Sequence, residues 1–216
     1  MYIIDSHIHL YLEEFSNDRE KLIKNAENEN IKKFLLPNID LESVEKMISL
    51  CKKHPKKCYP MIGLHPCYVD NNYVEKLSIL ENYLNTTKFI AVGEIGIDLH
   101  WDKTYINEQK KAFKTQISWA KKNHLPIVIH CRNSFDEIYK ILKEEYDENL
   151  FGVLHCFGGS VEQAKKLIDM NFFLGIGGVL TFKNSNLKSV LQQVPIDKIL
   201  IETDAPYLSP SPYRGK

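Results

Sequence analysis

The sequence predicts a (β/α)8 barrel of the TIM type, built as one domain over residues 1–216. Short apolar segments recur eight times along the chain, at a spacing of roughly one strand-and-helix unit. They are apolar throughout instead of alternating with polar residues, which indicates a parallel sheet covered on both faces. A doubly wound open sheet is the alternative. We favour the barrel because no glycine-rich turn follows the first strand to hold a dinucleotide.

The predicted strands are short runs of β-favouring apolar residues. They begin near residues 2, 33, 59, 89, 126, 152, 172 and 199. The third and fourth are expected to cover residues 59–63 and 89–94. Eight parallel strands of this kind close most simply into a barrel.

Amphipathic helices are predicted in the intervals between the strands. Helix-favouring segments with apolar residues in register lie at 16–33, 40–51, 77–84, 108–123, 134–142, 160–168 and 187–194. Asp40 is expected to cap the second helix. Ser134 with Glu137, and Ser160 with Gln163, have the spacing of capping boxes.

The chain ends soon after the eighth predicted strand. A barrel of this class usually takes about 250 residues, whereas this sequence has 216. We therefore expect the final C-terminal helix to be missing from this chain, as in a truncated form of the protein.

Charge and cysteine content narrow the class of protein. Lys and Arg together number 28, as do Asp and Glu, so the formal net charge is zero. A protein that coats nucleic acid usually has a basic excess, so any phosphate binding should be local. Five cysteines without a CxxC pair favour free thiols in a reducing cytosol. With no leader-like start and no apolar run of membrane length, we expect a cytoplasmic protein.

Polar side chains follow six of the predicted strands. Because alternate residues of a strand share a face, His7 and His9 should point the same way after the first strand. The carboxyl ends of barrel strands form the face where active sites lie. The polar strand ends are Asp5-Ser6-His7-Ile8-His9, Gly63-Leu64-His65, Gly93-Glu94, Ile129-His130, Leu154-His155 and Thr203-Asp204.

Four histidines and two carboxylates at this face could hold two divalent cations. His7, His9 and Asp204 come from neighbouring strands of a closed barrel and would hold one cation. His130 and His155 would hold the second, with Glu94 between the two, since a carboxylate can span cations about 3.5–4 Å apart. Nitrogen and oxygen ligands suit Zn, Mn, Fe or Co, whereas Mg prefers more oxygen. Such a centre activates water, which predicts a hydrolase.

The same strand ends, with their flanking residues, resemble the signature blocks of the TatD-related deoxyribonucleases, a family of amidohydrolase-like barrels. The resemblance covers essentially the whole chain. One departure is Leu99-His100-Trp101, where the family usually shows aromatic residues. The matching blocks are residues 5–9, 63–66, 93–98, 130–132, 155–159 and 202–208.

The resemblance implies a metal-dependent enzyme that hydrolyses DNA, often a 3′–5′ exonuclease acting on single-stranded ends in repair or DNA clearance. By position it implies that His65 and Arg132 contact substrate phosphate. It also implies six metal ligands, namely His7, His9, Glu94, His130, His155 and Asp204.

Further roles follow from position alone. Glu94 and Asp204 are the expected catalytic residues, with Asp204 orienting or deprotonating the attacking water. Trp101 could stack on a base near the mouth, and Arg214 could reach phosphate. We expect a monomer that takes DNA ends as substrate. Two alternatives stay open, namely a metal-dependent hydrolase of a small amide, lactone or phosphotriester, and a non-catalytic nucleic-acid- or metal-binding protein.

Overall fold

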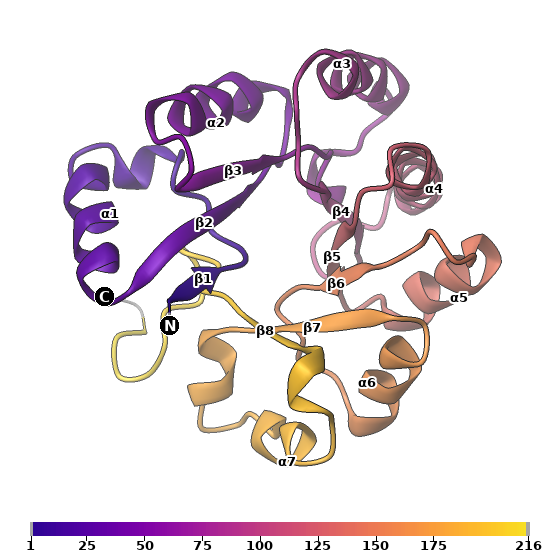
Figure 1. Cartoon of the computed structure of the whole chain (residues 1–216). Coiled ribbons are helices and arrows are strands. Elements are labelled where there is room, and N and C mark those ends of the chain that lie inside the picture. Colours follow the sequence, from indigo (N-terminus) through magenta and orange to yellow (C-terminus); the bar gives the residue numbers. More distant parts are fainter. Residues whose placement is uncertain (1, 215–216) are drawn as a thin grey trace.

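The computed structural model describes residues 2–214 and places eight strands at the centre of a ring of helices (Figure 1). The strands are β1 (Ile3–Asp5), β2 (Ile31–Pro37), β3 (Cys58–Met61), β4 (Val92–Asp98), β5 (Ile127–Arg132), β6 (Gly152–Leu154), β7 (Phe172–Ile176) and β8 (Ile199–Ile201). The helices are α1 (Arg19–Asn28), α2 (Leu41–Lys53), α3 (Tyr73–Thr86), α4 (Ile106–Lys122), α5 (Phe135–Glu145), α6 (Val161–Ile168) and α7 (Leu187–Leu191). Short 3-10 turns cover Glu13–Phe15, Pro66–Tyr68, Gly178–Thr181 and Ile196–Lys198.

The strands pair in parallel, in the orders β1-β2-β3 and β4-β5-β6-β7-β8. A parallel bridge between Ile62 and Val92 joins the two groups on one side. On the other side, Ser6 N donates to Ile201 O at 3.1 Å, and Asp204 N donates to His7 O at 2.8 Å. Backbone hydrogen bonds therefore bring β8 beside β1, and the predicted (β/α)8 fold class is confirmed.

The helices bury the apolar faces that their periodicity predicts. In α2, for example, Val44 and Met47 are fully buried. The inward residues of the other helices include Leu77, Leu80 and Leu84, then Phe113, Ile117 and Ala120, then Ile138, Ile141 and Leu142, then Ala164, Leu167, Leu187 and Val190. Apolar packing of these helices against the strands stabilises the barrel. The polar side chains at the strand ends take no part in this packing.

Two of the three predicted caps are confirmed. Asp40 accepts a hydrogen bond from Ser43 N at 2.8 Å, and Ser160 forms a reciprocal capping box with Gln163. The capping box predicted for Ser134 and Glu137 was wrong. The buried Ser134 hydroxyl donates instead to the Ile97 carbonyl at 2.6 Å. That bond ties the start of α5 to the end of β4.

β4 lies further along the chain than predicted. We expected a strand over residues 89–94 that ended at Glu94, but β4 runs from Val92 to Asp98. Ile95 and Ile97 are fully buried, so the strand continues past the polar residue. The prediction failed because Glu94 points into a polar barrel interior, where a carboxylate need not end a strand.

Close packing between β4 and β5 depends on one glycine. Gly96 has φ +143°, a backbone conformation that L side chains rarely adopt, and it pairs with His130. A Cβ atom at this position would lie 2.1 Å from the His130 carbonyl oxygen. Glycine here therefore lets β5 come close enough to bring His130 beside Glu94.

Between β8 and residue 214 the structure describes no further helix. Ile3, Ile4 and Ile201 on the strands at this side are 40, 37 and 52 % exposed. Among the described residues no helix is long and apolar enough to cross a lipid bilayer.

Candidate metal centre

The six side chains predicted as metal ligands meet inside the barrel. Glu94 and His130 lie within β4 and β5, and the other four directly follow their strands, His7 and His9 after β1, His155 after β6 and Asp204 after β8. Five of them are buried, and the side chain of His130 is 15 % exposed. Residues up to 197 positions apart in the sequence, His7 and Asp204, come within 3.6 Å through their side chains.

The Glu94 carboxylate lies between two groups of imidazoles. Its Oε2 atom is 3.2 Å from His7 Nε2 and 3.8 Å from His9 Nε2. Its Oε1 atom is 2.8 Å from His155 Nε2, 2.9 Å from His130 Nδ1 and 3.4 Å from His65 Nε2. One carboxylate thus touches both halves of the centre, which is the position expected of a bridging ligand.

The two acidic groups of the centre are held ionised. Burial would raise the pKa of Glu94, but the imidazoles of His155, His65 and His7 outweigh it and hold that pKa well below its usual range. Burial opposes ionisation of Asp204 as well, and a hydrogen bond from His9 lowers the pKa of that carboxyl. Two ionised carboxylates in a buried pocket of histidines are compatible with the binding of divalent cations.

Tyr11 fixes the proton on the His9 ring. The Tyr11 hydroxyl lies 3.0 Å from His9 Nδ1 and donates its hydrogen to the Pro37 carbonyl at 2.7 Å. A hydroxyl has one hydrogen, so towards His9 it can only accept, and His9 Nδ1 must carry the proton. The lone pair of a neutral His9 is then on Nε2, which faces Asp204 Oδ1 at 3.5 Å. This is the tautomer that a metal ligand needs.

Asp98 holds the His130 ring in a similar way. Its Oδ2 atom is 2.8 Å from His130 Nε2, while His130 Nδ1 faces Glu94. Burial would lower the pKa of His130, but these two hydrogen bonds raise it. Asp98 is therefore placed to hold the proton on Nε2 and leave Nδ1 for a cation.

Two further buried carboxylates support the strand ends. Asp5 accepts hydrogen bonds from His7 N at 3.2 Å and from Thr203 Oγ1 at 2.7 Å, which links the segments after β1 and β8. Glu202 accepts from Cys156 N at 2.5 Å, and its Oε1 atom is 3.7 Å from His155 Nδ1. These contacts hold the ligand-bearing segments in register.

A cavity of about 860 Å³ opens over the centre. Three of the four residues predicted to contact substrate, His65, Trp101 and Arg132, line it. The Arg132 guanidinium lies 5.2 Å from the centre of the Trp101 ring. Arg214, the fourth, lies over the Phe182 ring at 4.1 Å and is not among the described residues that line the cavity.

A family model described as TatD related DNase matches residues 4–216. The chain belongs to this family. It is 38% identical over 215 residues to an uncharacterized metal-dependent hydrolase, YabD, from Bacillus subtilis (strain 168), covering 99% of this chain and 84% of that protein. It is 28% identical over 216 residues to a protein named 3′-5′ ssDNA/RNA exonuclease TatD from Erwinia tasmaniensis, covering 99% of this chain and 83% of that one.

Solved structures agree with this assignment. The crystal structure of YjjV, a TatD homologue from Escherichia coli K12, superposes with a TM-score of 0.92 at 28% identity, over 99% of this chain and 83% of that one. A lactonase mutant from Deinococcus radiodurans superposes with a TM-score of 0.66 at 9% identity, over 94% of this chain and 77% of that one, which shows a shared fold only. The TatD-related chain is thus a metal-dependent hydrolase by family.

The residues of this TatD-related centre fit divalent cations. Both ring nitrogens of His7 and Nδ1 of His155 are buried and have no hydrogen-bond partner within residues 2–214. Such orphaned polar atoms are costly unless something binds them. Three overlapping groups have ligand atoms within 4.8 Å of one another, namely His7, His155 and Asp204, then His7, His9 and Glu94, then His65, Glu94 and His130. The last group adds His65, for which the family resemblance implies a contact with substrate phosphate.

Sequence reasoning assigned no role to Tyr11, Asp98 and Glu202. The role of Asp98 could have been predicted, because in a strand its side chain shares the inward face of Glu94, four residues earlier. The role of Tyr11 could not, since its hydrogen-bond partner Pro37 belongs to another strand.

Proposed function

We propose that this protein is a metal-dependent deoxyribonuclease that removes nucleotides from the 3′ ends of single-stranded DNA. The observation that carries the proposal is the Glu94 carboxylate between two groups of imidazoles, beneath a cavity with Arg132 on its wall. The name of the Erwinia relative, a 3′-5′ ssDNA/RNA exonuclease, supports the choice of substrate.

In this proposal His7, His9 and Asp204 would hold one divalent cation, and His130 and His155 would hold a second, with Glu94 available to both. Bound divalent cations lower the pKa of a water molecule and neutralise charge on a phosphate. His65 either completes the second group or contacts the phosphate, since its Nε2 atom faces both Glu94 and the cavity.

In this proposal Arg132 and Trp101, on the cavity wall, bind the substrate. The Arg132 guanidinium can donate two parallel hydrogen bonds to a phosphate, which a lysine could not do in that geometry. It packs over the ring of Trp101, a side chain that is 69 % exposed. A strand end bound at Arg132 would therefore have a base close to an aromatic surface.

Asp204 is the proposed proton acceptor. Its lowered pKa keeps the carboxylate ionised at neutral pH, so Oδ1 can take a proton from the attacking water. The water oxygen bonds to phosphorus, the bond from phosphorus to the 3′ oxygen breaks, and that oxygen takes a proton from solvent. The products are a 5′-nucleotide and a strand one nucleotide shorter.

The test is hydrolysis of 5′-labelled single-stranded DNA with Mn²⁺, beside a lactone, a dipeptide and a phosphotriester. We expect stepwise shortening that a chelator stops, and at least a 10²-fold loss in Glu94→Ala and in Asp204→Ala. Asp147→Ala, which removes a surface carboxylate paired with Lys121, is the matched control. Wild-type rates in both site variants, or turnover of only the small molecules, would refute the proposal.

We infer also that the protein acts in the cytosol, because all five cysteines are free thiols. We propose that it acts as a monomer, which light scattering in solution would check.

A further inference from the structure

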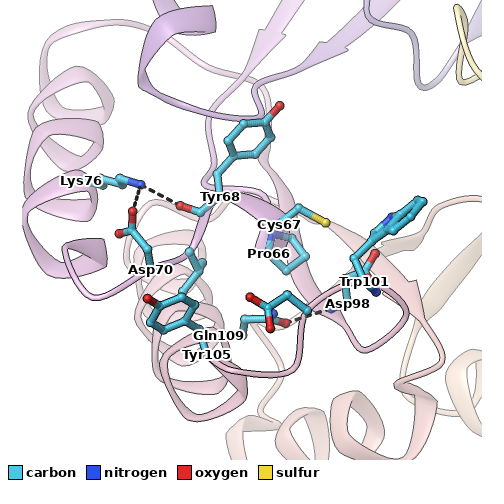
Figure 2. A pocket seen from close by; sticks show the side chains of 11 residues that line it. Pro66, Cys67, Tyr68, Asp70, Lys76, Asp98, Trp101, Tyr105 and Gln109 are labelled. Atoms are coloured by element: carbon cyan, nitrogen blue, oxygen red, sulfur yellow. Dashed lines mark hydrogen bonds and ion pairs between the residues drawn. The ribbon is translucent and has the colours of Figure 1, made fainter.

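A second hollow of about 280 Å³ lies beside the metal cavity (Figure 2). The two hollows share Cys67, Tyr68, Asp98 and Trp101 in their walls, so they adjoin. Apart from Trp101 and Asp98, which also line the metal cavity, the residues of this side pocket have no role in the proposed chemistry.

The wall between the two hollows is anchored to the metal centre. Asp98 Oδ1 accepts hydrogen bonds from His100 N at 2.9 Å and from Trp101 N at 3.3 Å. The other oxygen of the same carboxylate contacts His130 at 2.8 Å. The place of Trp101 is therefore fixed relative to the residues that would bind the scissile phosphate.

The lining of the side pocket suits a flat ring. Tyr105 and Trp101 lie on opposite sides of it, and Pro66 lies between them (Figure 2). Val69 adds a further apolar surface. Aromatic and apolar side chains can contact the face of a base whatever its identity.

The charges of the lining exclude a phosphate. Three carboxylates line the pocket, those of Asp70, Asp98 and Asp102, against the single ammonium group of Lys76. That ammonium group is already bound, because Nζ donates to Asp70 Oδ2 at 2.8 Å and to the Tyr68 carbonyl at 2.9 Å (Figure 2). An anion would meet more negative than positive charge here, whereas a neutral group with N–H donors would not be repelled.

Asp102 offers the free acceptor. Its Oδ1 atom accepts from Thr104 N at 2.8 Å, and the Thr104 side chain also hydrogen-bonds this carboxylate, which still has lone pairs for a further donor. An exposed carboxylate oxygen at the rim can accept from an amino group on a ring. Adenine, cytosine and guanine have such a group, and thymine does not.

We propose that the side pocket is a base-binding subsite, which takes the base of one of the two nucleotides that flank the scissile phosphate and favours bases with an exocyclic amino group. This inference rests on the proposed nuclease function. Trp101 and Tyr105 would contact the ring, and Asp102 would accept from the amino group.

The experiment measures kcat/KM on single-stranded oligonucleotides with Mn²⁺. In two of them an abasic residue replaces one or the other nucleotide that flanks the scissile phosphate. We expect a loss of roughly tenfold at one of the two positions, the scale of one aromatic contact with a base. At that position adenine should exceed thymine by several-fold. Equal rates on both abasic oligonucleotides and on the intact one would overturn the proposal.

Substitutions in the side pocket test whether the loss of kcat/KM on an abasic oligonucleotide arises there. Tyr105→Ala should abolish the abasic penalty, while Tyr146→Ala, which removes a half-exposed tyrosine at the end of α5, should keep it. Asp102→Asn keeps an acceptor for Thr104 N and can present an amide NH₂ in place of Oδ2, so it should reverse the preference towards thymine. An unchanged penalty in Tyr105→Ala, or an unchanged base preference in Asp102→Asn, would overturn the proposal.

The same assays separate this proposal from the one on which it rests. If the wild-type protein cleaves no oligonucleotide and no simple diester such as bis(p-nitrophenyl) phosphate, the proposed nuclease function fails and the subsite fails with it. If it cleaves both and abasic substitution has no effect, only the subsite is refuted.

Discussion

Tyr11→Phe removes the hydroxyl group that hydrogen-bonds the His9 ring from behind the metal centre. The ring of Tyr11 is 1 % exposed, so water cannot readily replace the hydroxyl, and Phe fills the same space. Two buried partners lose a hydrogen bond, His9 Nδ1 at 3.0 Å and the Pro37 carbonyl at 2.7 Å. Each unsatisfied group costs on the order of 1–3 kcal/mol, so we expect a free energy of unfolding lower by about 2 kcal/mol or more.

The larger effect should fall on cation binding. Without the hydroxyl, the proton on His9 is no longer held on Nδ1, and the ring loses its fixed orientation. Loss of such a supporting hydrogen bond typically costs about 10–100-fold in metal affinity. Competition with a chromophoric chelator for Mn²⁺ or Zn²⁺ at constant pH would measure this, and ¹⁵N NMR of the His9 ring would show which nitrogen carries the proton.

Tyr207→Phe is the matched control. The Tyr207 ring also packs edge-on against the His9 ring, with centroids 5.8 Å apart, but within the described chain its hydroxyl makes no hydrogen bond to His9. We expect metal affinity within about twofold of wild type. Equal affinities in Tyr11→Phe and Tyr207→Phe, or a His9 proton found on Nε2, would refute the reasoning about the tautomer.

Three further predictions concern the scaffold. Gly96→Ala forces a Cβ against the His130 carbonyl and should lower the free energy of unfolding by roughly 3 kcal/mol; an unchanged midpoint in urea would contradict this. Burial raises the pKa of Cys51 and of Cys58 to about 12, so both thiols should resist iodoacetamide at pH 8 in the native protein and react after unfolding in guanidinium. Alkylation of the native protein at the rate of the unfolded chain would show that this is wrong. Asp40→Ala removes the cap of α2 and should cost about 1 kcal/mol in thermal unfolding, whereas a loss below a few tenths would mean the cap contributes little.

The convergence of the proposed ligands could be predicted from the sequence because strand periodicity is a local property. His7 and His9 follow an apolar strand with one residue between them, and parallel strands present their carboxyl ends at one face of a barrel. Counting strands therefore predicts that Asp204 lies beside His7. The structure brings these side chains within 3.6 Å of one another.

The supporting contacts could not be predicted, because they join segments whose side-chain packing the sequence does not reveal. Tyr11 reaches Pro37 on another strand, and Ser134 turns from its own helix to the Ile97 carbonyl. Polar residues inside the barrel also obscure the strand ends in the sequence. Glu94 resembles the end of a strand, whereas β4 continues through buried isoleucines to Asp98.

The central claim is that Glu94 joins two cation sites that together hydrolyse a phosphodiester. The most direct test is nucleotide release from single-stranded DNA, measured while Mn²⁺ is added to metal-free protein in known equivalents. We predict little release at one equivalent, a steep rise towards the second, and no such rise in Glu94→Ala. Full activity at one equivalent, or release that persists in excess chelator, would contradict the account.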